Sequence, residues 1–278
     1  MQCLYQMHYA AGEKNEEIYK KIELKIKQKV LMEHLNYVIR GISSKNLIPI
    51  LNCIKFELTN EGLYLLSTDN ELAIKSFIPS MEIDEIDTMG EMLISGRYIY
   101  DFVKTLSGEV INIEEIIDSQ VLITTDSPNS SSRLKLNCNE VNEFPNIDLE
   151  FTNSPLLINQ KVFKTTINQT IFATSTQESR PILTGINFKI NENIMEVTAT
   201  DSYRLSKKRI ILDTKVEDNV DIIIPNRNLS EIIKLMSDED IKIELHIFTN
   251  KVIFKVNNLI IMSRLINGNY PDTNKLIP

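Results

Sequence analysis

The chain has 278 residues, and 42% of them are hydrophobic, which is enough to bury the core of one large domain or two ordinary ones, so we expect a folded protein. No stretch approaches the roughly 18 to 20 apolar residues of a membrane helix, and the first residues lack the basic-then-apolar order of a signal peptide, so we expect a cytoplasmic protein. The formal net charge is −8, so nucleic acid would be repelled unless the basic residues gather on one surface.

The first predicted element is an amphipathic helix. Leu31, Leu35, Val38 and Ile42 recur at helical spacing, so we expect them to form one apolar stripe against a core. The residues expected on the other faces of this helix are His34, Tyr37 and Arg40.

Three short β-rich runs follow, separated by Asn, Glu or Gly turn signals, and they are IKFEL, LYLLST and AIKSFI. A second helix comes next, with Ile99, Phe102, Val103 and Leu106 directed inward, and further strands follow it. This order predicts an α+β domain in which two helices pack on an antiparallel sheet.

The second half of the chain repeats the first. Residues 26–69 match residues 158–201 at an offset of 132 without a gap, and residues 94–114 match residues 224–244 at an offset of 130. The repeated inward positions of the two helices are Phe163, Ile167 and Ile171, then Leu229, Ile232, Ile233 and Met236.

The repeat predicts the domain organisation. Each copy closes on Ser-Arg-Leu followed by an aromatic residue and a proline, at 132–134 in the first copy and at 263–265 in the second. We therefore predict an N-terminal extension at residues 1–22 and two tandem α+β domains at residues 23–150 and 151–278.

Basic residues recur on both copies, away from the apolar stripes. They are Arg40, Lys45, Arg97 and Lys104 in the first copy, and Lys161, Lys164, Arg180, Arg227 and Lys234 in the second. An ordinary solvated helix face accounts for any one of them, but the matched positions favour one positive strip made by neighbouring helices. Such a strip suits sequence-independent contact with the phosphates of a duplex.

Patterns that indicate catalysis or a metal site are missing from the sequence. The histidines are His8, His34 and His246, and the cysteines are Cys3, Cys53 and Cys138, none of them at ligand spacing. Thr68-Asp69 and Thr200-Asp201 occupy equivalent places in the two copies, so we interpret them as turns in which the aspartate caps backbone amides. We expect no enzyme, no metal and no cofactor.

Three motifs resemble a known family. SRPILTGI at 179–186, ATDSYRLS at 199–206 and SRLINGNYPDTNKLIP at 263–278 closely resemble the bacterial DNA polymerase III β subunit, the DNA sliding clamp. The resemblance implies the DNA-clamp fold, with three similar domains per chain and a head-to-tail dimer of six domains around duplex DNA. It also implies a non-enzymatic processivity factor, associated with the nucleoid during replication, whose partners are the replicative DNA polymerase, the clamp loader and repair proteins.

The resemblance also assigns residues. Lys45, Arg97, Gln177, Arg180 and Arg227 match family positions that face or touch DNA, and helical phase adds Arg40, Lys104 and Lys234. A hydrophobic groove that docks short partner peptides would be formed by Leu183, Thr200, Ser202, Tyr203, Arg204, Leu205, Pro271 and Leu276. For Leu183 and Leu205, a place in the core is the alternative interpretation.

The family's third domain would begin where this chain ends, so we expect only the first two clamp domains. A fragment, a truncated product and a two-domain clamp remain open, and the ring would be a dimer if a third domain exists and a trimer if it does not. The alternative function is a truncated homologue that forms no ring and acts only as a peptide-binding scaffold or as a competitor of a full-length clamp. A hydrolase that uses the many carboxylates is a third hypothesis.

Overall fold

The computed structural model describes residues 21–43, 47–106, 110–116, 119–127, 130–216 and 218–273. Lys45 and Leu276, two of the predicted site residues, lie outside these ranges. Among the described helices, none is long and apolar enough to cross a membrane.

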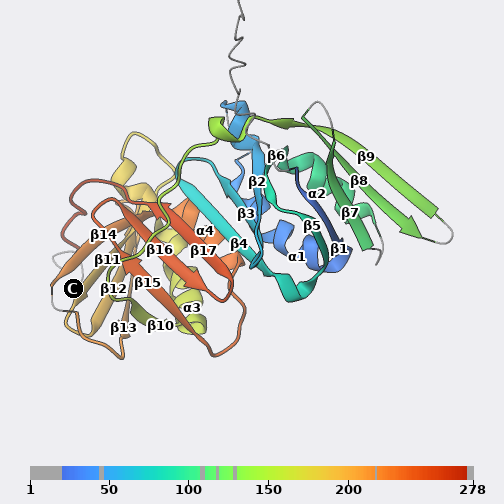
Figure 1. Ribbon diagram of the computed structural model, residues 1–278. Coiled ribbons are helices and arrows are strands. Elements are labelled where there is room, and N and C mark those ends of the chain that lie inside the picture. The colour runs from blue at the N-terminus through green and yellow to red at the C-terminus, as the bar shows by residue number, and fades with distance from the viewer. Residues whose placement is uncertain are drawn as a thin grey trace, which may run out of the picture.

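The two halves of the chain run through the same order of elements (Figure 1). The first half contains β1 (Glu23–Lys27), α1 (Gln28–Val38), β2 (Cys53–Leu58), β3 (Gly62–Thr68), β4 (Leu72–Pro79), β5 (Ile83–Thr88), β6 (Gly90–Ser95), α2 (Gly96–Thr105), β7 (Val110–Ile116), β8 (Gln120–Ser127) and β9 (Ser130–Asn139). The second contains β10 (Leu156–Asn159), α3 (Gln160–Thr170), β11 (Gly185–Asn191), β12 (Ile194–Thr200), β13 (Leu205–Ile211), β14 (Val220–Pro225), α4 (Asn226–Lys234), β15 (Lys242–Ile247), β16 (Lys251–Val256) and β17 (Leu259–Arg264). Among the described strands and α-helices only β5 has no counterpart, so the predicted α+β fold with two helices in each repeat is confirmed.

The first helix differs from its prediction at two points. The α-helix ends at Val38, and a 3-10 turn carries the chain to Gly41, so Ile42 lies beyond the helix although it continues the apolar stripe. His34, expected on an outer face, is buried, and its Nδ1 lies 2.7 Å from the hydroxyl oxygen of Ser76 on β4. A buried polar ring needs a partner, and the neighbouring strand supplies it.

One antiparallel sheet runs through both halves. Its thirteen strands are ordered β10-β15-β16-β17-β4-β3-β2-β6-β9-β8-β7-β1-β5, and a separate four-stranded sheet has the order β13-β12-β11-β14. The halves join where β17 pairs with β4, with Ile261 opposite Ile74. Main-chain hydrogen bonds therefore couple the two halves edge to edge, as Figure 1 shows at the centre of the molecule.

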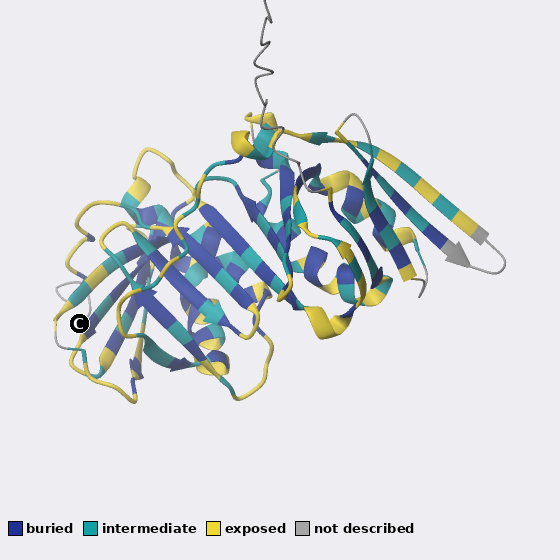
Figure 2. Cartoon of the chain, in the orientation of Figure 1, coloured by how far each residue is buried: buried dark blue, intermediate teal, exposed yellow. Residues whose placement is uncertain are grey.

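The core lies between the helices and the sheets. Leu31, Leu35 and Val38 of α1 are fully buried, as the apolar stripe predicts. Along the strands buried and half-buried residues alternate, visible as dark blue and teal bands in Figure 2, because successive side chains point to opposite faces. In the second half, Phe163 of α3 packs against Phe188 and Phe254, with ring centroids 6.2 and 5.6 Å away, so this helix is fixed to both sheets.

Candidate functional site

The turn after β3 has the geometry expected of a capped turn. Asp69 Oδ1 accepts hydrogen bonds from the backbone N–H groups of Glu71 at 3.1 Å and Leu72 at 2.8 Å. Asn70 between them has a φ of 74°, a conformation that asparagine tolerates better than most residues. The prediction that Asp69 caps backbone amides is confirmed.

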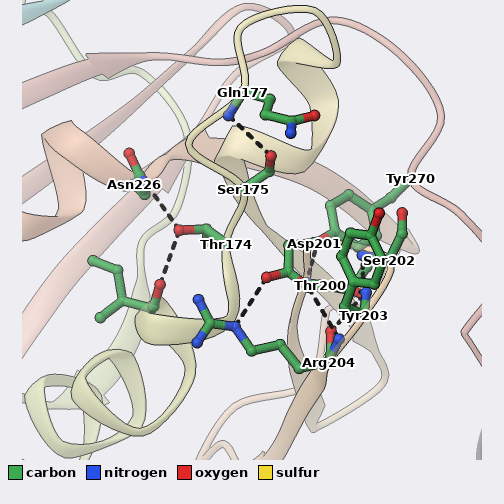
Figure 3. Close-up of polar contacts among 11 residues, drawn as sticks. Thr174, Ser175, Gln177, Thr200, Asp201, Ser202, Tyr203, Arg204, Asn226 and Tyr270 are labelled. Carbon is green, nitrogen blue, oxygen red and sulfur yellow. Dashed lines mark hydrogen bonds and ion pairs between the residues drawn. The ribbon is translucent and has the colours of Figure 1, made fainter.

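The turn after β12 repeats this geometry in the second half (Figure 3). Asp201 Oδ1 accepts from the N–H groups of Tyr203 and Arg204, each at 3.0 Å, and Ser202 has a φ of 78°. These backbone hydrogen bonds, with the Arg204 guanidinium, hold the pKa of Asp201 below its ordinary value. The two turns differ in their cation, because Arg204 Nε donates to Asp201 Oδ2 at 2.9 Å within the turn itself.

The cation of the first turn comes from the other half of the chain. Arg227, at the start of α4, donates to Asp69 Oδ2 at 2.7 Å, and the Asp69 side chain is only 4% exposed. The neighbouring Asn228 donates to the carbonyl oxygen of Glu71 at 3.1 Å and to the Ser263 hydroxyl at 2.8 Å. The first turn of α4 is therefore bonded across the junction between the two halves.

A second ion pair crosses the same junction. Arg40, in the turn that follows α1, donates from Nη1 to Glu231 of α4 at 3.1 Å, and Lys234 donates to the other oxygen of Glu231 at 2.6 Å. Burial raises the pKa of Glu231, but the hydrogen bonds from Lys234 and Arg40 outweigh it and leave the pKa below its ordinary value. Arg40, Arg227 and Lys234, which were predicted to belong to one positive strip, are therefore brought together at the junction, and each is paired with a carboxylate.

Two of the other predicted DNA-facing residues lie on α2. Arg97 is exposed near its start, and Lys104 is exposed near its end, 5.9 Å from the ring centroid of Tyr100. The hydroxyl of Tyr100 donates to Asn36 of α1 at 3.0 Å, so the two helices of the first half lie side by side. Arg97 makes no hydrogen bond or ion pair with any other described residue.

Gln177 and Arg180 lie in the loop between α3 and β11. Both are exposed, and Arg180 donates from Nη1 to the Ser202 hydroxyl at 3.2 Å. The loop is held by its backbone, since the N–H of Gln177 donates to the hydroxyl of Ser175 at 3.0 Å (Figure 3). The Gln177 side chain is therefore exposed on a loop that a backbone hydrogen bond holds in place.

Most of the predicted peptide-groove residues gather around the turn after β12. Leu183 is 6% exposed and packs in a small apolar cluster with Ile223 and Tyr270. The hydroxyl of Tyr270 accepts from the N–H of Thr200 at 2.9 Å, so the Tyr270 side chain links the segment before Pro271 to the turn. Leu183 thus belongs to a small core as well as to the candidate groove.

The outer residues of the candidate groove are open. Tyr203 is 96% exposed, Ser202 and Arg204 are exposed, and Leu205 is half-buried at the start of β13. The Arg204 guanidinium lies 5.8 Å from the ring centroid of Phe172, which is itself exposed. An exposed aromatic ring beside a cation offers an apolar contact for a peptide.

Sequence reasoning missed the residues that pair with the cations and bond across the junction between the two halves. Asp69 was recognised as a turn residue but not as the partner of Arg227, and Glu231 and Asn228 were not singled out. Glu231 stands three positions before Lys234 on a predicted helix, a spacing that indicates an ion pair. No sequence signal identifies Arg40 as its second partner.

Among the described residues, no group of three His, Cys, Asp or Glu side chains could hold a metal ion.

Two family models of known proteins match this chain, one in each half. Residues 22–148 match the model of the DNA polymerase III beta subunit N-terminal domain, and residues 157–272 match that of its central domain. The curated beta sliding clamp of Streptococcus pneumoniae is 35% identical over 261 residues, covering 92% of this chain and 68% of the relative, and that of Staphylococcus aureus is 34% identical over the same coverage.

Solved structures agree. The DNA polymerase sliding clamp of Bacillus subtilis superimposes with a TM-score of 0.87 at 32% identity, and the DNA polymerase III beta chain of Streptococcus pneumoniae with 0.86 at 34%; each comparison covers 92% of this chain and 68% of that chain. The names of these relatives favour the clamp over the scaffold hypothesis. The chain belongs to the DNA polymerase III beta subunit family, the beta sliding clamps.

Proposed function

We propose that this chain is a DNA sliding clamp subunit that surrounds duplex DNA without reading its sequence and acts by binding, not by catalysis. The observation that supports it is the pair of repeated halves, joined by β4 and β17 into one continuous sheet. Such a sheet is a stiff frame, and the helices of both halves can present their polar faces to a duplex. Topology would then retain the protein on DNA, so its individual contacts can be weak.

Within this function, we propose that the exposed cations of both halves contact phosphates. Arg97 and Arg180 are the strongest candidates, because Arg97 has no partner among the described residues and Arg180 has only a hydroxyl. Lys104 and Gln177 would add weaker contacts from the same helix and loop. Lys45 remains a candidate from the resemblance, as it lies outside the described residues.

A double charge reversal tests this assignment. Arg97→Glu with Arg180→Glu should weaken binding to a short fluorescent duplex and lower the dependence of log K on log salt by about two units, about one for each lost phosphate contact. The matched control is Arg209→Glu with Lys215→Glu. Arg209 of β13 lies opposite Glu196 of β12. Met195 and Val197, on either side of Glu196, are buried, so the side chains of Glu196 and Arg209 point to the face away from the core. Equal losses in the two double variants would refute the assignment.

We also propose that the turn after β12 docks short apolar peptides of the replicative polymerase, the clamp loader and repair proteins. Tyr203 would be the principal contact, because its ring is almost fully exposed and it lies two positions before Leu205 in the chain. Tyr203→Ala should abolish binding of a labelled clamp-binding peptide from the replicative polymerase. The matched control is Ile211→Ala, which changes an exposed apolar residue at the far end of β13 and should leave the binding unchanged. Peptide binding that survives Tyr203→Ala would contradict the groove assignment.

Self-association into a closed ring belongs to the same proposal. Six clamp domains can come from two three-domain chains or from three chains with two domains each. Sedimentation of the 278-residue chain, with and without nicked circular DNA, distinguishes a ring from a monomer. A monomer that is never retained on circular DNA would leave peptide binding as the only function of this chain.

A further inference from the structure

Glu231 is a carboxylate placed among the cations of the proposed DNA surface. It lies on α4 and accepts one hydrogen bond from Arg40 of the first half and one from Lys234 of its own helix. The three side chains are partly open to solvent, with 24% of Glu231, 35% of Arg40 and 51% of Lys234 exposed. A phosphate group that approaches the two cations therefore also approaches Glu231.

The second carboxylate at the junction is held differently. Asp69 is 4% exposed, and it accepts two backbone N–H groups besides Arg227, so its position is fixed by its own turn. Glu231 accepts only the two side-chain cations among the described residues, and both can turn away from it without leaving a backbone group unpaired. The Glu231 pairs can therefore exchange a carboxylate for a phosphate, whereas the Asp69 pair is part of the fold.

We propose that Glu231 limits the affinity of this clamp for DNA by holding Arg40 and Lys234 in competition with phosphate. The inference rests on the proposed clamp function and names a residue that opposes DNA contact instead of making it. At neutral pH Glu231 is ionised, because the same two cations keep its pKa low. Its charge repels phosphate and occupies two donors that would otherwise release counterions from DNA.

Such competition suits a protein that must move along its ligand. An unpaired cation exchanges only water for phosphate, whereas a paired cation must first break its hydrogen bond to a carboxylate. Paired cations therefore bind DNA less tightly than unpaired ones. Glu231 would thus keep two contacts weak without removing the positive charges that orient the duplex. The Arg40 pair also crosses the junction, so Arg40 and Glu231 link the two halves.

The test is Glu231→Gln, which removes the charge and keeps the shape. Binding of a short fluorescent duplex should tighten, and the salt dependence of log K should steepen by up to about two units. For each additional phosphate that the released cations neutralise, the ratio of the affinities at about 50 and about 200 mM salt should rise about 3.5-fold. Glu239→Gln removes the same charge from an exposed residue that has no ion pair in the described part of the chain, and it should leave the slope unchanged.

A triple variant identifies the cations. Adding Arg40→Ala and Lys234→Ala to Glu231→Gln should return the slope to that of the unmodified chain or below it. If Glu231→Gln and Glu239→Gln have the same slope, or if Glu231→Gln lowers only the thermal midpoint, the inference is overturned and the clamp function stands. If the unmodified chain itself does not bind duplex DNA at about 50 mM salt, the proposed function fails and the inference fails with it.

Discussion

Replacing Asp69 with alanine should destabilise the protein by about 1–4 kcal/mol. The substitution leaves the N–H of Leu72 without its acceptor, and Leu72 is buried, so this loss costs about 1–3 kcal/mol. The N–H of Glu71 can turn to water, because Glu71 is exposed. The lost pair with Arg227 adds at most about 1 kcal/mol, since the Arg227 side chain is 57% exposed.

The internal repeat supplies a matched control. Asp201→Ala removes the same capping carboxylate, but the N–H groups that it leaves belong to Tyr203 and Arg204, which are both exposed and can bond to water. We therefore expect a smaller loss of stability for Asp201→Ala than for Asp69→Ala. Urea unfolding followed by circular dichroism measures both free energies of unfolding, and hydrogen exchange at β4 and β17 reports whether the junction opens locally.

Equal losses for the two alanine variants would refute this account of Asp69. They would mean that the buried Leu72 amide and the Arg227 pair contribute nothing beyond the turn itself, so that Asp69 would not stabilise the junction. A double-mutant cycle between Asp69→Ala and Arg227→Ala isolates the ion pair, and a vanishing coupling energy would remove it from the explanation.

Local packing and burial lead to two more expected outcomes. Gly41→Ala should destabilise the protein by about 1–3 kcal/mol in urea unfolding, because the added Cβ would lie 2.3 Å from the hydroxyl oxygen of Ser67 and 3.1 Å from its carbonyl oxygen; an unchanged midpoint would contradict this packing. Burial and the hydrogen bond to Glu33 raise the pKa of Tyr37 to about 12, so its contribution to stability is full below about pH 10 and is lost as the pH rises through about 12. In an ultraviolet titration, Tyr37→Phe should have one tyrosine fewer that ionises near pH 12 than the unmodified chain. The same number in both proteins would exclude the pKa shift.

The sequence by itself determined the two-copy organisation and the type of each main element. Helical and alternating apolar periodicities are local properties, and the 132-residue offset repeats them, so α1 and α3 could be placed before any contact was known. The two Thr-Asp turns were also predictable, because the capping aspartate and the amides that it accepts lie within three residues of each other.

Tertiary structure alone decided which charges meet. Arg227 and Asp69 are 158 residues apart in the chain, and Arg40 and Glu231 are 191 apart, so no local pattern links either pair. They meet because β17 pairs with β4 and brings α4 beside the first half. Helical phase identified the exposed face that carries these cations, but whether a cation on that face is free or paired depends on a neighbour that only the folded chain supplies.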